Sequence, residues 1–97
     1  MTVAIIGVGL IGGSMALSLR DLGIADKVVG VDANEDHQRR ALELGLIDEA
    51  AGLDAAIQQS ALIVLAIPVD AAALLLPGIM DSVDRQVVMD TSSTKQQ

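Results

Sequence analysis

The sequence predicts an α/β domain with a doubly wound, mainly parallel sheet of about five strands in the order 3-2-1-4-5 and helices on both faces. Three observations predict it. Short, continuously apolar runs end at glycine or proline, as strands buried on both faces do. Segments with helical periodicity separate these runs, and parallel strands need such crossovers. The chain has no Phe, Trp or Tyr, so its core must consist of aliphatic side chains that suit close helix-on-sheet packing.

Length and composition indicate one domain spanning residues 1–97, with 52% hydrophobic and 20% charged residues. A formal net charge of -7 disfavours nucleic acid or an anionic membrane as a partner. Cysteine is absent, which excludes disulfides and cysteine zinc sites, and no pattern predicts a metal site. Met1 leads into an apolar strand without a basic segment, and no apolar run approaches about 18 residues. We therefore expect neither a signal peptide nor a membrane span, and a cytoplasmic location.

Turn and cap residues indicate where the predicted helices begin and end. Gly23 and Gly45 are expected to close the first two helices, and Asn34 to cap the second. Asp70 is expected to cap the fourth helix, which Pro77–Gly78 should bend or end. In chain order, the predicted elements are a strand at 3–7, a helix at 10–22, a strand at 27–32, a helix at 35–44, a short strand or irregular crossing within 46–52, a helix at 53–59, a strand at 61–67, a helix from 71 and a strand at 86–90.

The stretch VAIIGVGLIGGS at 3–14 carries the main functional signal, because it contains the spacing G-x-G-x-x-G. Gly7 permits a tight turn off the strand, Gly9 lets backbone approach a diphosphate, and Gly12 lets the helix pack closely on the sheet. The helix N-terminus offers unpaired N–H groups and a partial positive charge, so an acidic chain is still able to bind phosphate. This pattern is typical of a Rossmann-type dinucleotide site. The alternative is a tight strand-to-helix connection without a nucleotide.

Asp32 ends the second strand, 20 residues after Gly12, where an acidic residue accepts hydrogen bonds from the adenosine ribose. Its charge would repel a 2′-phosphate and favour NAD over NADP. The alternative for Asp32 is a turn residue or a cap on the following helix. The residues expected to contact NAD are Gly7, Gly9, Leu10, Ile11, Gly12, Asp32, Ala33, Ile67 and Pro68.

Other polar residues have simpler interpretations. His37, the single histidine, is expected on the surface of a polar helix start, without catalytic or metal partners. Arg39 and Arg40 lie more than a turn into the same helix and are expected to be solvated. Pro68 either shapes the loop over the crevice at the carboxyl ends of the strands or simply ends its strand. The cluster at 92–95 follows the last strand at that same edge.

The sequence resembles the nucleotide-binding part of prephenate dehydrogenase and the similar arogenate dehydrogenase. The combination of the glycine motif with "LELGLID" makes the resemblance specific, and together the matching stretches cover nearly the whole chain. They are IIGVGLIGGS (5–14), VVGVD (28–32), ALELGLIDEA (41–50), LIVLAIPV (62–69) and, more loosely, VVMDTSSTK (87–95).

This resemblance implies NAD(P)-dependent oxidative decarboxylation of a cyclohexadienyl substrate, prephenate or arogenate, giving 4-hydroxyphenylpyruvate or tyrosine. In the family a segment like D-x-G-S-V-K follows the last of these strands, and its serine faces the substrate. That serine corresponds to Ser93, the one catalytic residue expected in this chain, although Ser92 and Thr94 replace the family's glycine and valine. The catalytic histidine, the substrate-binding arginines and a helical substrate and dimerisation domain are expected outside residues 1–97, in a homodimeric enzyme. The chain alone is therefore expected to be inactive.

Two alternatives remain at this stage. The same fold serves other oxidoreductases, such as β-hydroxyacid dehydrogenases and pyrroline-carboxylate reductases. A non-enzymatic NAD-sensing domain would also have the glycine turn and the carboxylate.

Overall fold

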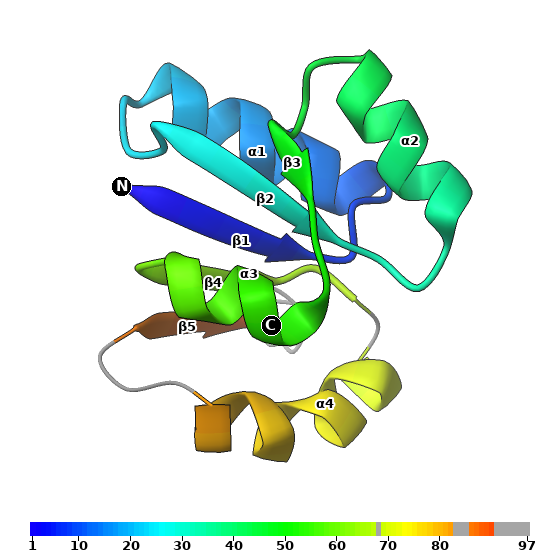
Figure 1. Cartoon of the computed structure of the whole chain (residues 1–97), viewed down its shortest axis with the longest axis vertical. Coiled ribbons are helices and arrows are strands. Elements are labelled where there is room, and N and C mark those ends of the chain that lie inside the picture. The colour runs from blue at the N-terminus through cyan, green and yellow to red at the C-terminus, as the bar shows by residue number, and fades with distance from the viewer. Residues whose placement is uncertain (68, 83–85, 91–97) are drawn as a thin grey trace, which may run out of the picture.

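Strands and helices alternate along the chain in the computed structural model, which describes residues 1–67, 69–82 and 86–90 (Figure 1). The predicted cluster at 92–95 and Pro68 lie outside these residues. None of the helices in the described part is long and apolar enough to cross a membrane. The elements are β1 (Thr2–Ile6), α1 (Leu10–Asp21), β2 (Lys27–Val31), α2 (Glu35–Glu43), β3 (Glu49–Ala50), α3 (Leu53–Gln59), β4 (Leu62–Leu65), α4 (Val69–Ser82) and β5 (Val87–Asp90).

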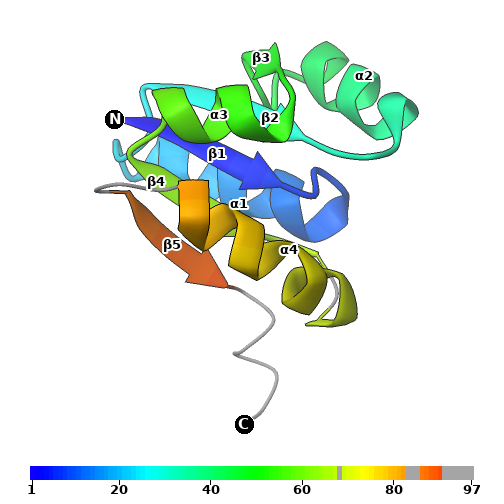
Figure 2. The same ribbon diagram turned by 60° about the horizontal axis from the view of Figure 1, so that its bottom comes forward.

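The five strands form one parallel sheet in the order β3-β2-β1-β4-β5, which confirms the predicted order. In β1, Ile5 lies opposite Gly30 of β2 on one side and Val64 of β4 on the other. Strands β3 and β5 form the two edges (Figure 2). Because all strands run the same way, their carboxyl ends share one edge of the sheet, and α1 begins there directly after β1 (Figure 1).

Side-chain alternation along β1 creates two separate cores, one on each face of the sheet. Val3 and Ile5 pack with Ala16 of α1 and Ala41 of α2. Ala4 and Ile6 face the other way and pack with a second buried set, consisting of Val29, Ala56, Ile57, Ile63, Leu65 and Ile79. Helices α1 and α2 therefore cover one face, and α3 and α4 cover the other, as the doubly wound prediction requires.

Helix α4 differs from the prediction in two ways. It begins at Val69, so Asp70 lies in its first turn instead of capping it. It also continues through Pro77 to Ser82, so of the two expected effects of Pro77–Gly78, a bend or an end of the helix, the end does not occur. The proline removes only one helical hydrogen bond, on a side where Leu74 is 83% exposed, while Ile79 beyond it is fully buried. Burial of Ile79 outweighs the local preference to stop.

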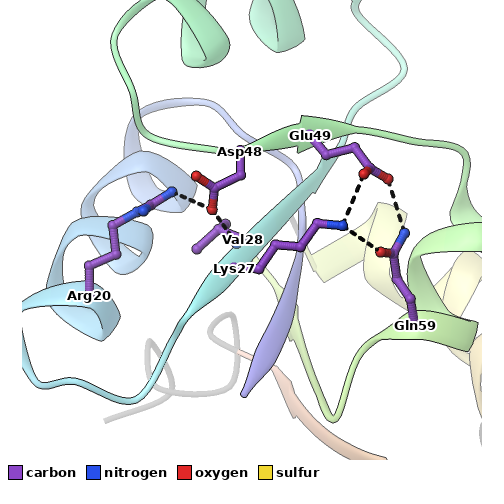
Figure 3. A network of polar contacts seen from close by, with 6 residues as sticks. All are labelled: Arg20, Lys27, Val28, Asp48, Glu49 and Gln59. Atoms are coloured by element: carbon purple, nitrogen blue, oxygen red, sulfur yellow. Dashed lines mark hydrogen bonds and ion pairs between the residues drawn. The ribbon is translucent and has the colours of Figure 1, made fainter.

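The two-residue strand β3 pairs with β2 through its backbone, and side-chain contacts add to this pairing (Figure 3). Asp48 accepts hydrogen bonds from the Val28 amide and from Arg20 of α1, both at 2.8 Å, while the Asp48 amide donates to the Val28 carbonyl. A second triad links three elements, because Lys27 pairs with Glu49 at 3.0 Å and Gln59 bonds both of them. These side-chain contacts therefore reinforce the backbone pairing of a very short strand.

The hydrogen bond from the Val28 amide is the main reason why the pKa of the Asp48 carboxyl lies below its usual value; burial opposes this shift, and the smaller effect of Arg20 adds to it. A carboxyl whose pKa is lowered by folding stabilises the fold above its unfolded pKa of about 4, and this contribution is lost as the pH falls through the folded value. Asp48 is therefore a source of acid sensitivity.

We expect Asp48→Ala to reduce the free energy of unfolding by about 1–2 kcal/mol at pH 7, because it removes two charge-assisted hydrogen bonds at a partly exposed site. Urea unfolding measures the change. The difference from the unmodified chain should shrink at about pH 3 as the carboxyl becomes protonated. Asp21→Ala, at the exposed last residue of α1, is the control and should change stability by less than about 0.5 kcal/mol. An Asp48 effect of equal size at both pH values would contradict this account.

Candidate nucleotide-binding site

The turn after β1 requires glycine at position 7. Gly7 has a φ of 92°, which side-chain-bearing residues rarely adopt, and its amide donates to the Val31 carbonyl at 2.7 Å. A Cβ atom there would lie 2.8 Å from the Ala66 carbonyl oxygen and would also crowd Ile67. The turn is therefore in contact with the ends of β2 and β4, which confirms the prediction that Gly7 permits a tight turn after β1.

The amino end of α1 is open to an anion. Gly9 is the N-cap, no side chain caps the helix, and no acidic residue lies in its first turn. The first helical hydrogen bond runs from the Gly13 amide to the Gly9 carbonyl, so the earlier amides have no acceptor within the helix. A Cβ atom on Gly9 would meet nothing within 4 Å. The helix thus presents bare backbone and the positive end of its dipole to open space, which fits a diphosphate.

Gly12 has a different task. A Cβ atom at this position would overlap the Gly7 carbonyl oxygen and would come within 3.1 Å of the Ile5 side chain. Only a glycine lets α1 lie this close to β1 and its turn, as predicted from the motif.

Asp32 follows β2 directly and lies beside the glycine turn. Its Oδ2 accepts a hydrogen bond from the Val8 amide at 3.0 Å, and its Oδ1 accepts one from the Asn34 amide at 2.8 Å. The side chain is only 14% exposed. The bond to Asn34 is a local turn contact, so the turn interpretation of Asp32 describes part of its role. Asn34, as predicted, caps α2 by accepting from the Asp36 amide. A carboxylate has about four acceptor positions, so Asp32 retains capacity for ribose hydroxyls.

A cleft of about 700 Å³ opens at the carboxyl ends of the strands. Four residues of the predicted cofactor set line it, namely Gly7, Asp32, Ala33 and Ile67. Gly9 lines a neighbouring hollow, while Leu10 and Ile11 form the first turn of α1 beside it. Gly12 packs against the Gly7 carbonyl, and Pro68 and Ser93 are outside the described residues.

The sequence prediction missed one wall of the cleft. It is formed by the segment that joins β3 to α3, together with residues of α2 and α4. The predicted strand order contained the necessary signal, because it places the carboxyl end of β3 beside that of β2. The missed lining residues are Glu35, Gln38, Ala50, Ala51, Gly52, Leu53, Ala71 and Leu75.

His37 is half exposed, which confirms the expected surface position. Its Nδ1 also lies 3.3 Å from Asp32 Oδ2, a contact that was not predicted from the sequence and that arises because the first turn of α2 brings His37 back over the end of β2. Arg39 forms an ion pair with Asp36 at 3.3 Å and is 68% exposed, which confirms a solvated role. No group of three or more potential metal ligands occurs among the described residues.

Comparison with known proteins agrees with this geometry. Residues 15–97 match the family described as "Prephenate dehydrogenase, nucleotide-binding domain". The chain belongs to this family. Family membership favours the resemblance seen in the sequence over the other oxidoreductase classes and over a sensing domain.

Relatives of this prephenate dehydrogenase domain extend the match through the glycine motif. Prephenate dehydrogenase of Bacillus subtilis is 31% identical over 98% of the chain. The chain spans only 26% of that protein. The crystal structure of prephenate dehydrogenase from A. aeolicus, in complex with hydroxyphenyl propionate and NAD+, has a TM-score of 0.83 and 31% identity, covering 93% of this chain and 32% of that one. Synechocystis arogenate dehydrogenase has a TM-score of 0.81 and 28% identity, with the same coverage of 93% and 32%.

Proposed function

We propose that the chain is the NAD-binding domain of a prephenate or arogenate dehydrogenase. The whole enzyme would oxidatively decarboxylate prephenate to 4-hydroxyphenylpyruvate, a reaction of tyrosine biosynthesis. The observation that carries the proposal is the direct bond between the glycine turn and Asp32, in a domain of this family. This bond fixes the separation between the helix N-terminus that would bind the diphosphate and the carboxylate that would bind the ribose.

Each part of the site would bind one part of NAD. The amides at the start of α1 would hold the diphosphate, and Asp32 would accept hydrogen bonds from the adenosine ribose. Ala51 and Leu53 offer apolar lining for the adenine in the same cleft. NAD, when bound, supplies the hydride acceptor, while the residues of this chain position it and exclude a 2′-phosphate through the charge of Asp32.

The substrate half of the reaction belongs to parts outside the described residues. Ser93 remains a prediction for a substrate contact. The relatives are about four times as long as the chain, which supports a further domain. From the family resemblance, we propose that this domain is mainly helical and carries the catalytic histidine and the arginines. We further propose a homodimeric, cytoplasmic enzyme. Apolar residues are exposed on α4 and β5, including Leu74, Met80, Val87 and Met89, and such a surface suits coverage by another domain or subunit.

Calorimetry and a dehydrogenase assay test this function together. We expect the chain to bind one NAD with a Kd on the order of 0.1–1 mM, because the cofactor would contact only one wall of a complete active site. With prephenate and NAD present, the chain alone should form no NADH, since we propose that the catalytic histidine and the substrate-binding arginines lie in the part of the longer relatives that it does not match. Absence of any NAD binding would contradict the cofactor assignment. Measurable turnover by the chain alone would contradict the proposal that another domain is needed to bind the substrate.

A further inference from the structure

Gln38 differs from its neighbours at the start of α2. Residues 35–40 are exposed to solvent, except Gln38, which is partly buried. Its side chain turns towards the sheet, where Nε2 donates to the Gly30 carbonyl of β2 at 3.2 Å. The same carbonyl accepts the Ala51 amide at 3.1 Å, where β3 ends. The end of the Gln38 side chain therefore lies beside the carboxyl ends of β2 and β3, and it lines the main cleft.

The bond to Gly30 fixes which way the Gln38 amide points. A carbonyl oxygen only accepts hydrogen bonds, so the atom of Gln38 that faces it must be the amide nitrogen. The other terminal atom, Oε1, is an acceptor and has no hydrogen-bond partner among the described residues. Nε2 also keeps its second hydrogen. The cleft is thus lined by a side chain that offers one acceptor and one donor next to each other.

This amide lies where the adenine of a bound dinucleotide would be placed. Asp32, the proposed ribose acceptor, follows Gly30 by two residues. Their Cα atoms are therefore no more than about 7 Å apart, which is similar to the span of an adenine ring system. Ala51 and Leu53, the apolar lining proposed for adenine, share the cleft with Gln38. An adenine packed against this lining would have its polar edge within reach of the Gln38 amide.

Gln38 is better suited to an adenine edge than the other polar side chains that line the described cleft, which are Asp32 and Glu35. Adenine carries an amino donor at N6 beside an acceptor at N7, and a glutamine amide matches both. Carboxylates only accept hydrogen bonds, and Asp32 already accepts two backbone amides. Gln38 therefore supplies the one side-chain donor in the described lining.

We propose that Gln38 recognises the adenine base and makes the cleft selective for adenine dinucleotides. Oε1 accepts from N6 and Nε2 donates to N7, while the bond to Gly30 is kept. A base with a carbonyl in place of the amino group would bring two acceptors together. Rotation of the amide would not relieve this, because Oε1 would then face the Gly30 carbonyl. The inference rests on the proposed NAD site, since it assigns the base next to the proposed ribose contact.

Binding of NAD and of nicotinamide hypoxanthine dinucleotide to the intact chain tests the inference. In the second compound a carbonyl group replaces the amino group of the adenine. NMR titration of the ¹⁵N-labelled chain should give a Kd about five- to tenfold lower for NAD, as expected when one hydrogen bond is lost and an acceptor is left unpaired. The side-chain amide signal of Gln38 should shift with NAD and much less with the hypoxanthine compound.

Two variants separate adenine recognition from attachment of α2 to the sheet. Gln38→Met has a similar length but neither donor nor acceptor, so the two Kd values should come within about twofold of each other. Gln38→Glu loses the bond to Gly30 but keeps an acceptor, so it should still bind NAD more tightly. A purely structural role would lower stability in both variants without changing the ratio of Kd values. Gln58→Met, at an exposed position of α3, is the matched control and should behave like the unmodified chain.

The outcomes separate this inference from the proposed function. If neither dinucleotide binds, the NAD site itself is contradicted. If the unmodified chain binds both equally, or if the Gln38 amide signal shifts equally with both, the inference is overturned and the NAD site stands. If Gln38→Met keeps the preference for NAD, or if Gln38→Glu loses it, the inference is overturned as well.

Discussion

Replacement of Gly12 by alanine is expected to destabilise the fold by about 3–5 kcal/mol. The added Cβ atom would overlap the carbonyl oxygen of Gly7, and backbone at a tight turn has no rotamer by which to move away. Helix α1 would have to separate from β1, which opens the core that contains Ile5 and Ala16. Because a domain of this size has only about 5–15 kcal/mol of stability, much of it would be lost. Urea unfolding followed by circular dichroism measures the effect.

Gly9→Ala is the matched control for Gly12→Ala. The two glycines belong to one motif, but a Cβ atom on Gly9 meets nothing within 4 Å. We expect this variant to lose less than about 1 kcal/mol, the scale of an altered N-cap. Its added methyl group would instead intrude on the space assigned to the diphosphate and weaken NAD binding. Equal destabilisation by the two substitutions would contradict the separate roles given to these glycines.

Asp32→Ala is expected to raise the Kd for NAD about 10- to 100-fold, because the variant would lose the proposed charge-assisted hydrogen bonds to the ribose. The affinity for NADP should fall less or rise, since the charge that repels a 2′-phosphate is gone. The ratio of the two dissociation constants is therefore the informative measurement. It is obtained by calorimetry with both cofactors at pH 8.5.

Asp32→Asn separates the binding role of Asp32 from its structural role. Asp32 also accepts bonds from the Val8 and Asn34 amides, so its removal loosens the turn as well as the ribose contact. The asparagine has the same shape but no charge, and its single oxygen keeps one of the two amide bonds, so it should loosen the turn less than alanine does while reducing discrimination against NADP. If both variants discriminate as the unmodified chain does, the carboxylate does not contact the ribose.

The predictable parts of the fold are those encoded by local patterns. Strand β1 alternates between two cores, and apolar runs for β2 and β4 are equally clear, so the parallel sheet and its order followed from the sequence. Strand β3 is different, because it has only two residues. Its contacts join Asp48 to Val28 and Glu49 to Lys27, and the partners in each contact are far apart in the sequence. Its exact position was not predictable from local periodicity.

The candidate site likewise has features that the sequence predicts and features that it does not. The glycine turn and Asp32 were predictable because their spacing and their position after neighbouring strands define them. The contact between His37 and Asp32 was not, because it depends on how α2 turns back over the end of β2. The wall contributed by the β3–α3 segment required strand order combined with side-chain placement. Tertiary geometry therefore supplied what residue type and spacing did not.

The most direct test of the central claim is an NMR titration of the ¹⁵N-labelled chain with NAD. The claim is that amides at the start of α1 hold the diphosphate while Asp32 holds the ribose. It predicts saturable chemical-shift changes that are largest for amides from Gly7 to Gly13 and around Asp32. Little change is expected near Asp48, which lies by the amino-terminal ends of the strands. Saturable NAD binding without chemical-shift changes in the glycine turn, or with changes centred on Asp48, would contradict the claim.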